Sequence, residues 1–437
     1  MRNGSTRVVV VGGGAAGVAT ASAMVREGGD GLEVRIVERA YRLGPGLAYR
    51  TDAPVHLLNN YAARMSILDD DPAHLLRWCR TNDIPAAAET FIPRHVYGDY
   101  LEAVLADQVR APGSQVTRLR GEVVDILDDG SDYLVCVGAD WQLRADVVVL
   151  ALGNPPPRTP ESVRLAARAY LADPWAPHLI DCVKPGADVL LVGTGLTMVD
   201  VAAQIAMARP DARMVAASRH GRLPEGHLPT LPGPAVELAT DEHTLAGLLR
   251  DIRLRLRGGA DWRELVESLK PCANDLWAQL SEREREQFVL HVARHWEVAR
   301  HRMAPAMGEI VDALLAEGRL TVTTTDQVEV AGYDLVVNCT GPAPVCTPGW
   351  NPLVDRLAAA GMLRAGPLGL GLDVDPDGAL RIARGESARG IYAVGAARRG
   401  VEWETAAVPD LRRQASALAR RIGARSSRVS ELVGSDR

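Results

Sequence analysis

Two glycine-rich turns, each directly after an apolar run, constrain this chain more than any other feature. The first is VVVVGGGAAG at residues 8–17, and the second is VLLVGTGLTM at 189–198. A β-branched run that ends in glycines is typical of a strand buried on both faces of a parallel sheet. When a helix follows such a turn, its N-terminal amide groups can bind a pyrophosphate. Two such turns therefore predict two dinucleotide-binding units in one chain.

The first turn carries the complete GxGxxG spacing, with Gly12, Gly14 and Gly17. The first glycine allows the tight turn, the second lets the backbone approach the pyrophosphate, and the third lets helix and strand pack closely. A second strand is predicted at 32–37. Glu38 follows it, where a carboxylate accepts hydrogen bonds from ribose hydroxyl groups. A βαβ corner that binds nothing is the weaker alternative.

The second turn keeps Gly193 and Gly195, but Met198 stands where the third small residue belongs. A strand predicted at 213–218 ends in a basic residue, Arg219, where the first unit has Glu38. Arginine accepts a 2′-phosphate that a carboxylate would repel, so NADPH is favoured over NADH. The alternative is a degenerate unit without a bound nucleotide.

Composition excludes several function classes. The chain has 437 residues, 47% of them hydrophobic, and a formal net charge of −6. This balance predicts neither a nucleic-acid partner nor an anionic membrane surface. No apolar run reaches the roughly 18 residues that span a bilayer. The N-terminal apolar run breaks at once into glycines, which does not fit a signal peptide, so we expect a cytoplasmic protein.

Cysteine and histidine spacing argues against redox-pair and metal chemistry. None of the six cysteines forms a CxxC or CxxxxC pair, which disfavours flavin disulfide reductases and zinc ribbons. His291 and His295 have helical spacing, with His301 nearby, but no HExxH motif is present. We therefore expect no metal site.

The order of the predicted segments gives an α/β fold with two Rossmann-like domains. Apolar strands that end in small residues, at 146–154 and 334–342, are expected to carry the chain between the domains. The FAD-binding domain is predicted as discontinuous, with an inserted NAD(P)-binding domain, a helical insert and a flexible tail. The expected ranges are 1–182 and 335–423 for the first domain, 183–334 for the second, about 235–317 for the insert and 424–437 for the tail.

Longer segments add a family resemblance to these turns. They are RLGPGLAY, HLLNNYAARMS, FIPRHVYGDYL, DPWAP, SRHGRLPEGH, DWRELVESLKP, HWEVARHRMAP, NCTGP and RRGVEWETAAVPDLRRQA. Together with the turns they resemble bacterial FAD/NAD(P)-binding proteins that are distantly related to flavin-containing and N-hydroxylating monooxygenases. The resemblance covers nearly the whole chain. It implies FAD and NADPH as cofactors.

The resemblance also implies which residues lie at the cofactors. Asn59, Met65 and Ser66 are expected near the flavin ring, and residues 395–405 near the flavin and ribityl chain. The full expected set is Gly12, Gly14, Ala15, Ala16, Gly17, Glu38, Arg39, Asn59, Met65, Ser66, Gly153, Gly193, Gly195, Leu196, Thr197, Ser218, Arg219, Arg222, Gly341, Gly395, Trp403, Glu404 and Thr405.

Two departures from related flavoproteins shape the expected reaction. Ala396 stands where most flavoproteins of this build have Asp. The Phe-Gly…His signature of relatives that oxidise ketones is missing before the second turn, which disfavours a Baeyer–Villiger reaction. The strand from Asp334 to Gly341 instead resembles that of the N-hydroxylating relatives.

The leading hypothesis is an NADPH-using monooxygenase that takes dioxygen and oxygenates a small amine or amino-acid-like molecule through a flavin hydroperoxide. The candidate catalytic residues are Asn59, His227, Arg302 and Glu404. One alternative is a flavin oxidase or dehydrogenase with a vestigial NADP domain. Another is a non-enzymatic flavin-binding redox sensor. The substrate and the oligomeric state stay open.

Overall fold

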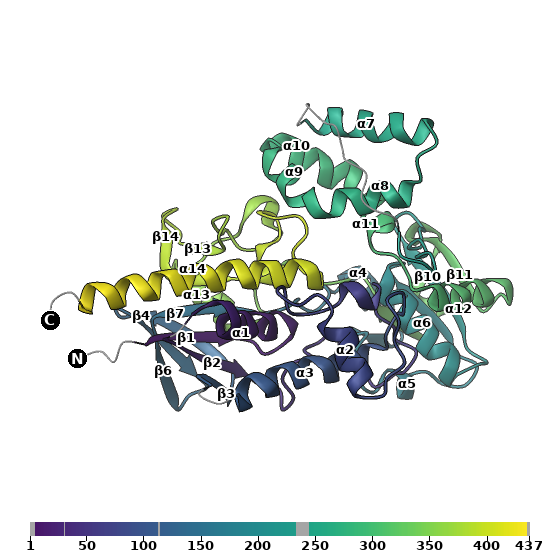
Figure 1. The fold of residues 1–437 in the computed structure, drawn as a ribbon. Coiled ribbons are helices and arrows are strands. Elements are labelled where there is room, and N and C mark those ends of the chain that lie inside the picture. Colours follow the sequence, from purple (N-terminus) through teal and green to yellow (C-terminus); the bar gives the residue numbers. More distant parts are fainter. Residues whose placement is uncertain (1–4, 30, 112–113, 233–243, 435–437) are drawn as a thin grey trace.

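The computed structural model describes residues 5–29, 31–111, 114–232 and 244–434, and it confirms the predicted α/β fold (Figure 1). Two largely parallel sheets, one in each half of the molecule, each contain a strand that ends in one of the two glycine turns. A smaller antiparallel sheet packs beside the first, and a helical layer stands over the second. The two termini lie together at the end of the molecule far from the second sheet.

The first sheet has six strands in the order β13-β14-β7-β1-β2-β3, and only β13 is antiparallel to its neighbour. β1 lies between β2 and β7, so its valines are covered on both faces, which explains the unbroken apolar run. The strands are β1 (Thr6–Val11), β2 (Leu32–Glu38), β3 (Val116–Arg120), β7 (Val147–Leu150), β13 (Ala379–Arg381) and β14 (Ser387–Ala393).

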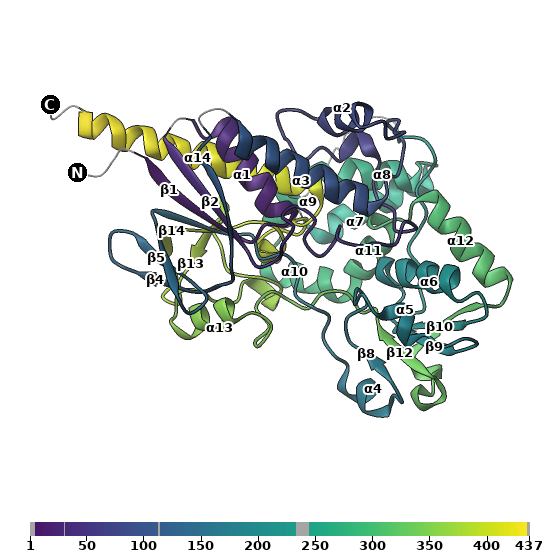
Figure 2. The same cartoon turned by 90° about the horizontal axis from the view of Figure 1, so that it is seen from below.

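Helices cover one face of this sheet, and the antiparallel sheet with α13 covers the other. In Figure 2, α1 and α3 run alongside β1 and β2. The elements are α1 (Ala15–Glu27), α2 (His74–Thr81), α3 (Arg94–Arg110), α13 (Pro352–Ala359) and α14 (Val408–Gly434), with β4 (Val123–Asp128), β5 (Tyr133–Val137) and β6 (Trp141–Ala145).

The second sheet has five parallel strands in the order β11-β10-β9-β12-β8. Its strands are β8 (Tyr170–Leu171), β9 (Asp188–Val192), β10 (Arg213–Ser218), β11 (Leu320–Thr324) and β12 (Leu335–Asn338). The helices of this half are α4 (Glu161–Ala166), α5 (Leu179–Cys182), α6 (Leu196–Ala208) and α12 (Pro305–Ala316).

The strand pairings correct two expected boundaries. β12 pairs with β9 along its whole length, although the chain was expected to return to the first domain at 335. β8 pairs with β12, so the second sheet also begins before residue 183. The expected boundary at 335 was wrong because the apolar run that was expected to leave the second domain is a buried strand of its sheet, β12. Division of the chain into an FAD-binding and an NADPH-binding domain stays a prediction.

The helical insert consists of short capped helices that stand over the second sheet (Figure 1). Thr244 and Asp261 cap two of them, and Ser281 forms a capping box with Glu284. Part of the expected range, 233–243, lies outside the described residues, and α12 packs with the second sheet instead. The helices are α7 (Leu245–Arg257), α8 (Trp262–Leu269), α9 (Ala273–Gln279), α10 (Glu282–Gln287) and α11 (Ala293–Arg300), with a π-helical turn at Phe288–Val292.

The C-terminal segment differs from its expectation. Residues from 424 onward were expected to form a flexible tail, but α14 continues as a helix to Gly434. No glycine or proline interrupts 424–433, so nothing in the sequence ends the helix earlier. Within the described residues, no helix is both long and apolar enough to cross a bilayer.

The remaining short helical turns connect these elements. They are η1 (Ala62–Arg64), η2 (Lys270–Cys272), η4 (Thr325–Gln327), η5 (Val330–Gly332), η6 (Pro367–Gly369) and η7 (Gly395–Arg398).

Candidate functional site

The first glycine turn has the tight geometry that its sequence predicts. Gly12 has φ +103°, and an added Cβ would lie 2.3 Å from the carbonyl oxygen of Ala151. A Cβ on Gly17 would lie 2.0 Å from the carbonyl oxygen of Gly12. Gly14 is the N-cap of α1, and α1 has no acidic residue in its first turn. The free amide groups of α1 are therefore open to an anionic group.

Glu38 is fixed beside this turn. As the last residue of β2, it accepts hydrogen bonds from the backbone N–H of Gly13 and of Ala40, both at 2.8 Å. The carboxylate thus lies at the edge of the glycine turn, where a ribose was expected. Arg39 points away from the turn, with its guanidinium exposed and 3.4 Å from Glu122.

The second turn repeats this backbone frame. Gly193 has φ +114°, and an added Cβ would lie 2.4 Å from the carbonyl oxygen of Cys339. Gly195 is the N-cap of α6, so Leu196 and Thr197 form its first turn. Met198 is fully buried in the apolar core of the second sheet. A large side chain thus fills the place that Gly17 holds in the first unit, without loss of the turn.

Residues at and after the end of β10 form hydrogen bonds with the second turn. The hydroxyl of Thr194 lies 2.5 Å from the carbonyl oxygen of Arg222 and 2.9 Å from the hydroxyl of Ser218. Arg219 is exposed at this edge. The guanidinium of Arg222 lies 3.2 Å from Nδ1 of His295 on α11, so the helical insert reaches the second turn.

The segment expected near the flavin ring is held from several sides. Met65 and Ser66 are buried, and Tyr97 donates a hydrogen bond to the carbonyl of Met65 (2.8 Å). The hydroxyl of Ser66 donates to Asp71 (2.7 Å), and Arg412 donates to the carbonyl of Ser66 (3.0 Å). The Ser66 hydroxyl is thus engaged within the protein.

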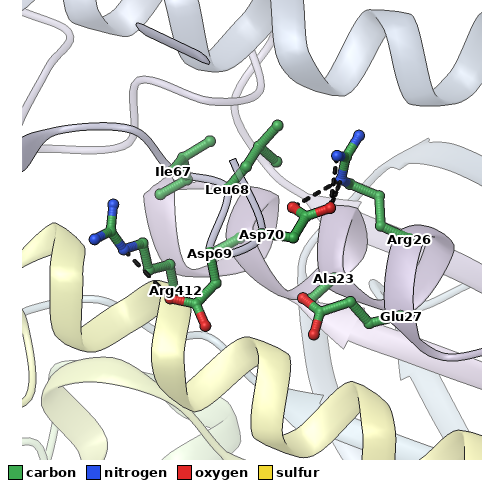
Figure 3. Close-up of a pocket in the computed structure, with 9 residues that line it drawn as sticks. Ala23, Arg26, Glu27, Ile67, Leu68, Asp69, Asp70 and Arg412 are labelled. Carbon is green, nitrogen blue, oxygen red and sulfur yellow. Dashed lines mark hydrogen bonds and ion pairs between the residues drawn. The ribbon is translucent and has the colours of Figure 1, made fainter. Parts of the chain in front are cut away.

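Figure 3 shows how the residues after Ser66 are fastened between α1 and α14. Arg26 pairs with Asp70, and Arg412 with Asp69. The cavity between these side chains has a volume of about 10 Å³, room for no more than a water molecule. This hollow is too small to hold a substrate molecule.

The segment at 395–405 is clamped by the helical insert. Asn274 donates to the carbonyl of Glu404 (2.8 Å), and its amide oxygen accepts from the N–H groups of Trp403 and Glu404. The Glu404 carboxylate accepts from Trp296 (2.8 Å) and lies 3.3 Å from Arg300. The insert therefore fixes the turn that precedes α14.

Two of the four catalytic candidates meet directly. Nε2 of His227 lies 3.0 Å from the carbonyl oxygen of Asn59. Burial lowers the pKa of His227 to about 3, helped by the charges of Arg302 and Lys270, so the ring is neutral at physiological pH. Glu404 stands apart from this pair, in the clamp.

The third candidate, Arg302, lies in a buried ionic cluster. Its guanidinium contacts Glu267, which also contacts Arg64 and lies 2.5 Å from Nζ of Lys270. Burial would raise the pKa of Glu267, but the three cations outweigh it and hold the pKa at about 2. Burial lowers the pKa of Lys270 to about 7, and the charge of Arg300 adds to this.

A second buried ion pair joins the two halves. Arg94, at the start of α3, lies 2.7 Å from Asp200 on α6. Beside it, Nε2 of His56 lies 3.2 Å from the carbonyl oxygen of Asp200. Nearby, a cavity of about 290 Å³ lies where the halves meet, lined mainly by apolar residues such as Leu57, Phe91 and Ala304.

Several residues that build the site were not predicted. Gly13 and Thr194 sit in the middle of the two turns, and their position there was a usable signal. Arg64, Glu267 and Asn274 had no such signal, because their partners are distant in the sequence. The sequence pattern of the insert predicts helices, but it does not predict which residues these helices contact.

Comparisons with known proteins agree with this geometry. Residues 9–155 match the model of a family described as FAD-NAD(P)-binding. The expected resemblance is confirmed. No curated protein matches the chain in sequence. The match covers the end of β1, the first turn, Glu38 and β7, so it includes the elements where the first nucleotide site is expected.

Solved structures share the fold over nearly the whole chain. An ornithine N-hydroxylase from Kutzneria sp. 744, described with reduced FAD, NADP⁺ and L-ornithine, has a TM-score of 0.61 at 17% identity. The ornithine hydroxylase of Pseudomonas aeruginosa gives 0.63 at 17%, and the L-lysine 6-monooxygenase of Pseudomonas syringae 0.62 at 16%. Each alignment covers 96% of this chain and 99% of the other. The two-unit flavoprotein fold is therefore shown.

Proposed function

We propose that this chain is an FAD-dependent monooxygenase that uses NADPH and oxygenates the nitrogen of a small amine or amino-acid-like substrate. The observation that carries the proposal is the presence of two intact nucleotide turns in one fold. Gly12 and Gly193 have the same left-handed geometry, and in each a Cβ would strike a neighbouring carbonyl. The solved structures with this fold include ornithine and lysine hydroxylases.

The residues of the first unit fit FAD. Gly12 and Gly17 leave no room for a side chain at the turn, and Glu38 presents its carboxylate beside it. In the segment expected near the flavin, Nε1 of Trp403 and the hydroxyl of Thr405 are buried without a hydrogen-bond partner in the described part of the chain. Buried donors of this kind call for a partner, which a cofactor would supply.

Each group of residues has a distinct role in the proposed reaction. The amide groups of α1 and Glu38 would hold the adenosine diphosphate of FAD, and α6 with Arg219 would hold NADPH. When bound, FAD supplies the redox and oxygen-activating chemistry. His227 fixes the backbone of Asn59, which positions the Asn59 side chain for a hydrogen bond with substrate or flavin. The clamp on Glu404 keeps the helical insert closed over the site and excludes water.

The test compares oxygen consumption and hydroxylamine formation across a panel of amines, with NADPH as reductant. Gly193→Ala should abolish NADPH-driven turnover and leave the FAD content unchanged, because the added methyl group meets the Cys339 carbonyl beside the second turn and leaves the first turn unaltered. Gly259→Ala is the matched control, since this glycine also has a positive φ but faces open space. Unchanged turnover in Gly193→Ala would contradict the proposal.

One alternative function is supported by a structural observation. A flavin oxidase or dehydrogenase with a vestigial second unit is favoured by Met198, which fills a position that is small in the first unit. In that case substrate would reduce the flavin without NADPH, and Gly193→Ala would leave turnover intact.

A further inference from the structure

Three cationic side chains converge on a single buried carboxylate. They lie where the first unit, the helical insert and the loop before α12 meet. Arg64 belongs to η1 of the first unit, Glu267 to α8 and Lys270 to η2 of the insert, and Arg302 to the loop before α12. We call these four residues the cationic cluster. When Lys270 is protonated, three positive charges face one negative charge, and the cluster carries a formal excess of two positive charges.

No other carboxylate in the described part of the chain balances this excess. Glu267 is the acidic partner of Arg64, Lys270 and Arg302 alike. The neighbouring groups add positive charge. The guanidinium of Arg263 stacks on the ring of Trp262, and Arg302 lies over the same ring. The carboxylate of Glu404 is engaged by Arg300 and Trp296.

The cluster also contains a donor without an acceptor. Nε of Arg302 is buried and has no hydrogen-bond partner among the described residues. Arg302 itself is 1% exposed. A buried cation without full pairing is costly, and so is a buried donor without an acceptor. Both costs disappear when anionic oxygens enter the cluster.

The cluster is open on one side. The side chain of Arg64 is 32% exposed and that of Lys270 15%, whereas Glu267 and Arg302 are nearly sealed. A ligand would therefore meet Arg64 and Lys270 first. Arg64 directly precedes Met65, in the segment expected beside the flavin ring, so a ligand held here would lie next to the proposed reaction site.

We propose that the cationic cluster selects a small amine that carries two carboxylate groups. This inference rests on the proposed function, because it names the substrate class of the same site. Two carboxylates would neutralise the excess charge and supply the missing acceptor. A substrate with a second ammonium group would instead be repelled by the three cations.

The test titrates the FAD-loaded protein with succinate and follows tryptophan fluorescence, to which Trp262 beside the cluster contributes. Succinate should bind, whereas uncharged succinamide and the dication of 1,4-diaminobutane should not bind measurably. Arg64→Gln and Lys270→Gln should each weaken succinate binding about tenfold or more. Arg64→Lys keeps the charge and should retain most of the affinity.

Arg144→Gln is the matched control, because Arg144 is an exposed, ion-paired arginine on β6 of the antiparallel sheet. It should leave succinate binding unchanged. Equal binding of succinate and succinamide would overturn the inference, as would unchanged affinity in both cluster variants. FAD content of each variant verifies that it is folded.

Reduction of the flavin by NADPH, measured on the same samples, separates the two proposals. Selective succinate binding without flavin reduction would overturn the monooxygenase proposal and leave the anion site standing. Flavin reduction without selective succinate binding would overturn the cluster inference alone. When succinate binds selectively and NADPH reduces the flavin, turnover should favour amino dicarboxylates over diamines of equal length.

Discussion

Glu38 links the sequence motif to the proposed cofactor. Its position was predicted from spacing alone, because a strand of fixed rise carries it to the same edge as the glycine turn. The structure adds a contact that the spacing did not foresee, the bond from the Gly13 amide. That bond holds the carboxylate in place before any ribose arrives, which reduces the entropy cost of binding.

Glu38→Gln should therefore weaken FAD binding about tenfold, because a charged acceptor of ribose hydroxyls is lost. Flavin fluorescence during reconstitution of the apoprotein measures the dissociation constant. Glu33→Gln is the matched control, since Glu33 lies on the same strand and pairs with Arg35. If both variants bind FAD as the wild type does, Glu38 does not contact the ribose.

Arg219 gives the corresponding test in the second unit. It is exposed at the end of β10, and we expect it to contact the 2′-phosphate of NADPH. Arg219→Ala should raise the KM for NADPH about tenfold and leave the KM for NADH nearly unchanged. Arg213→Ala, at the opposite end of the same strand, should change neither value. Equal effects of Arg219→Ala on the two cofactors would show that it does not bind the phosphate.

At the scale of elements, the helical insert holds the turn before α14 in place. Asn274 alone forms three hydrogen bonds with the backbone of Trp403 and Glu404. Trp277 adds a bond to the carbonyl of Gly400 (2.9 Å). These contacts bridge more than a hundred residues of sequence, so the segment near the flavin depends on the docking of the insert.

Asn274→Ala should lower the stability of the holoprotein by about 1–3 kcal/mol, because buried backbone groups lose their partners. The midpoint of thermal unfolding, followed by flavin release, measures this. Asn82→Ala removes an exposed side-chain bond at the end of α2 and should have little effect. A similar small shift in both variants would mean that the clamp does not hold the site.

The elements were predictable from the sequence to the extent that local pattern determines them. β1, α1, β9 and α6 follow from apolar runs and glycines. The strand at 335–338 was predicted as a strand but placed in the wrong sheet, because apolar character does not reveal which neighbour a strand pairs with. The contacts of Asn274 and Glu267 could not be predicted from the sequence for the same reason, because they depend on tertiary docking.

For the whole molecule, the junction between the halves is a buried polar site. His56 lies against Arg94 and Asp200, with Thr51 2.7 Å from its other nitrogen and Trp175 packed edge-on. Burial lowers the pKa of His56 to about 4, and the charge of Arg94 adds to this. Burial raises the pKa of Asp200 to about 6, although Arg94 opposes the shift.

The lowered pKa of His56 predicts a loss of stability in acid. The unfolded chain takes up this proton near pH 6.5 and the folded chain only near pH 4, so stability present above pH 6.5 is lost as the pH falls. Protonation of His56 should lower the free energy of unfolding by about 2 kcal/mol between pH 7 and pH 5. His56→Gln should flatten that slope in urea unfolding, and exposed His178→Gln should not. If the slope of stability against pH is unchanged in His56→Gln, burial at the junction does not lower the pKa of His56.

In the proposed reaction, both nucleotide units work together. Mixing the FAD-loaded protein with NADPH without oxygen, while the flavin absorbance is recorded, tests this most directly. The oxidised flavin band should bleach, and it should bleach far more slowly with NADH or in Gly193→Ala. A flavin band that stays unchanged under NADPH would show that the two units do not work together.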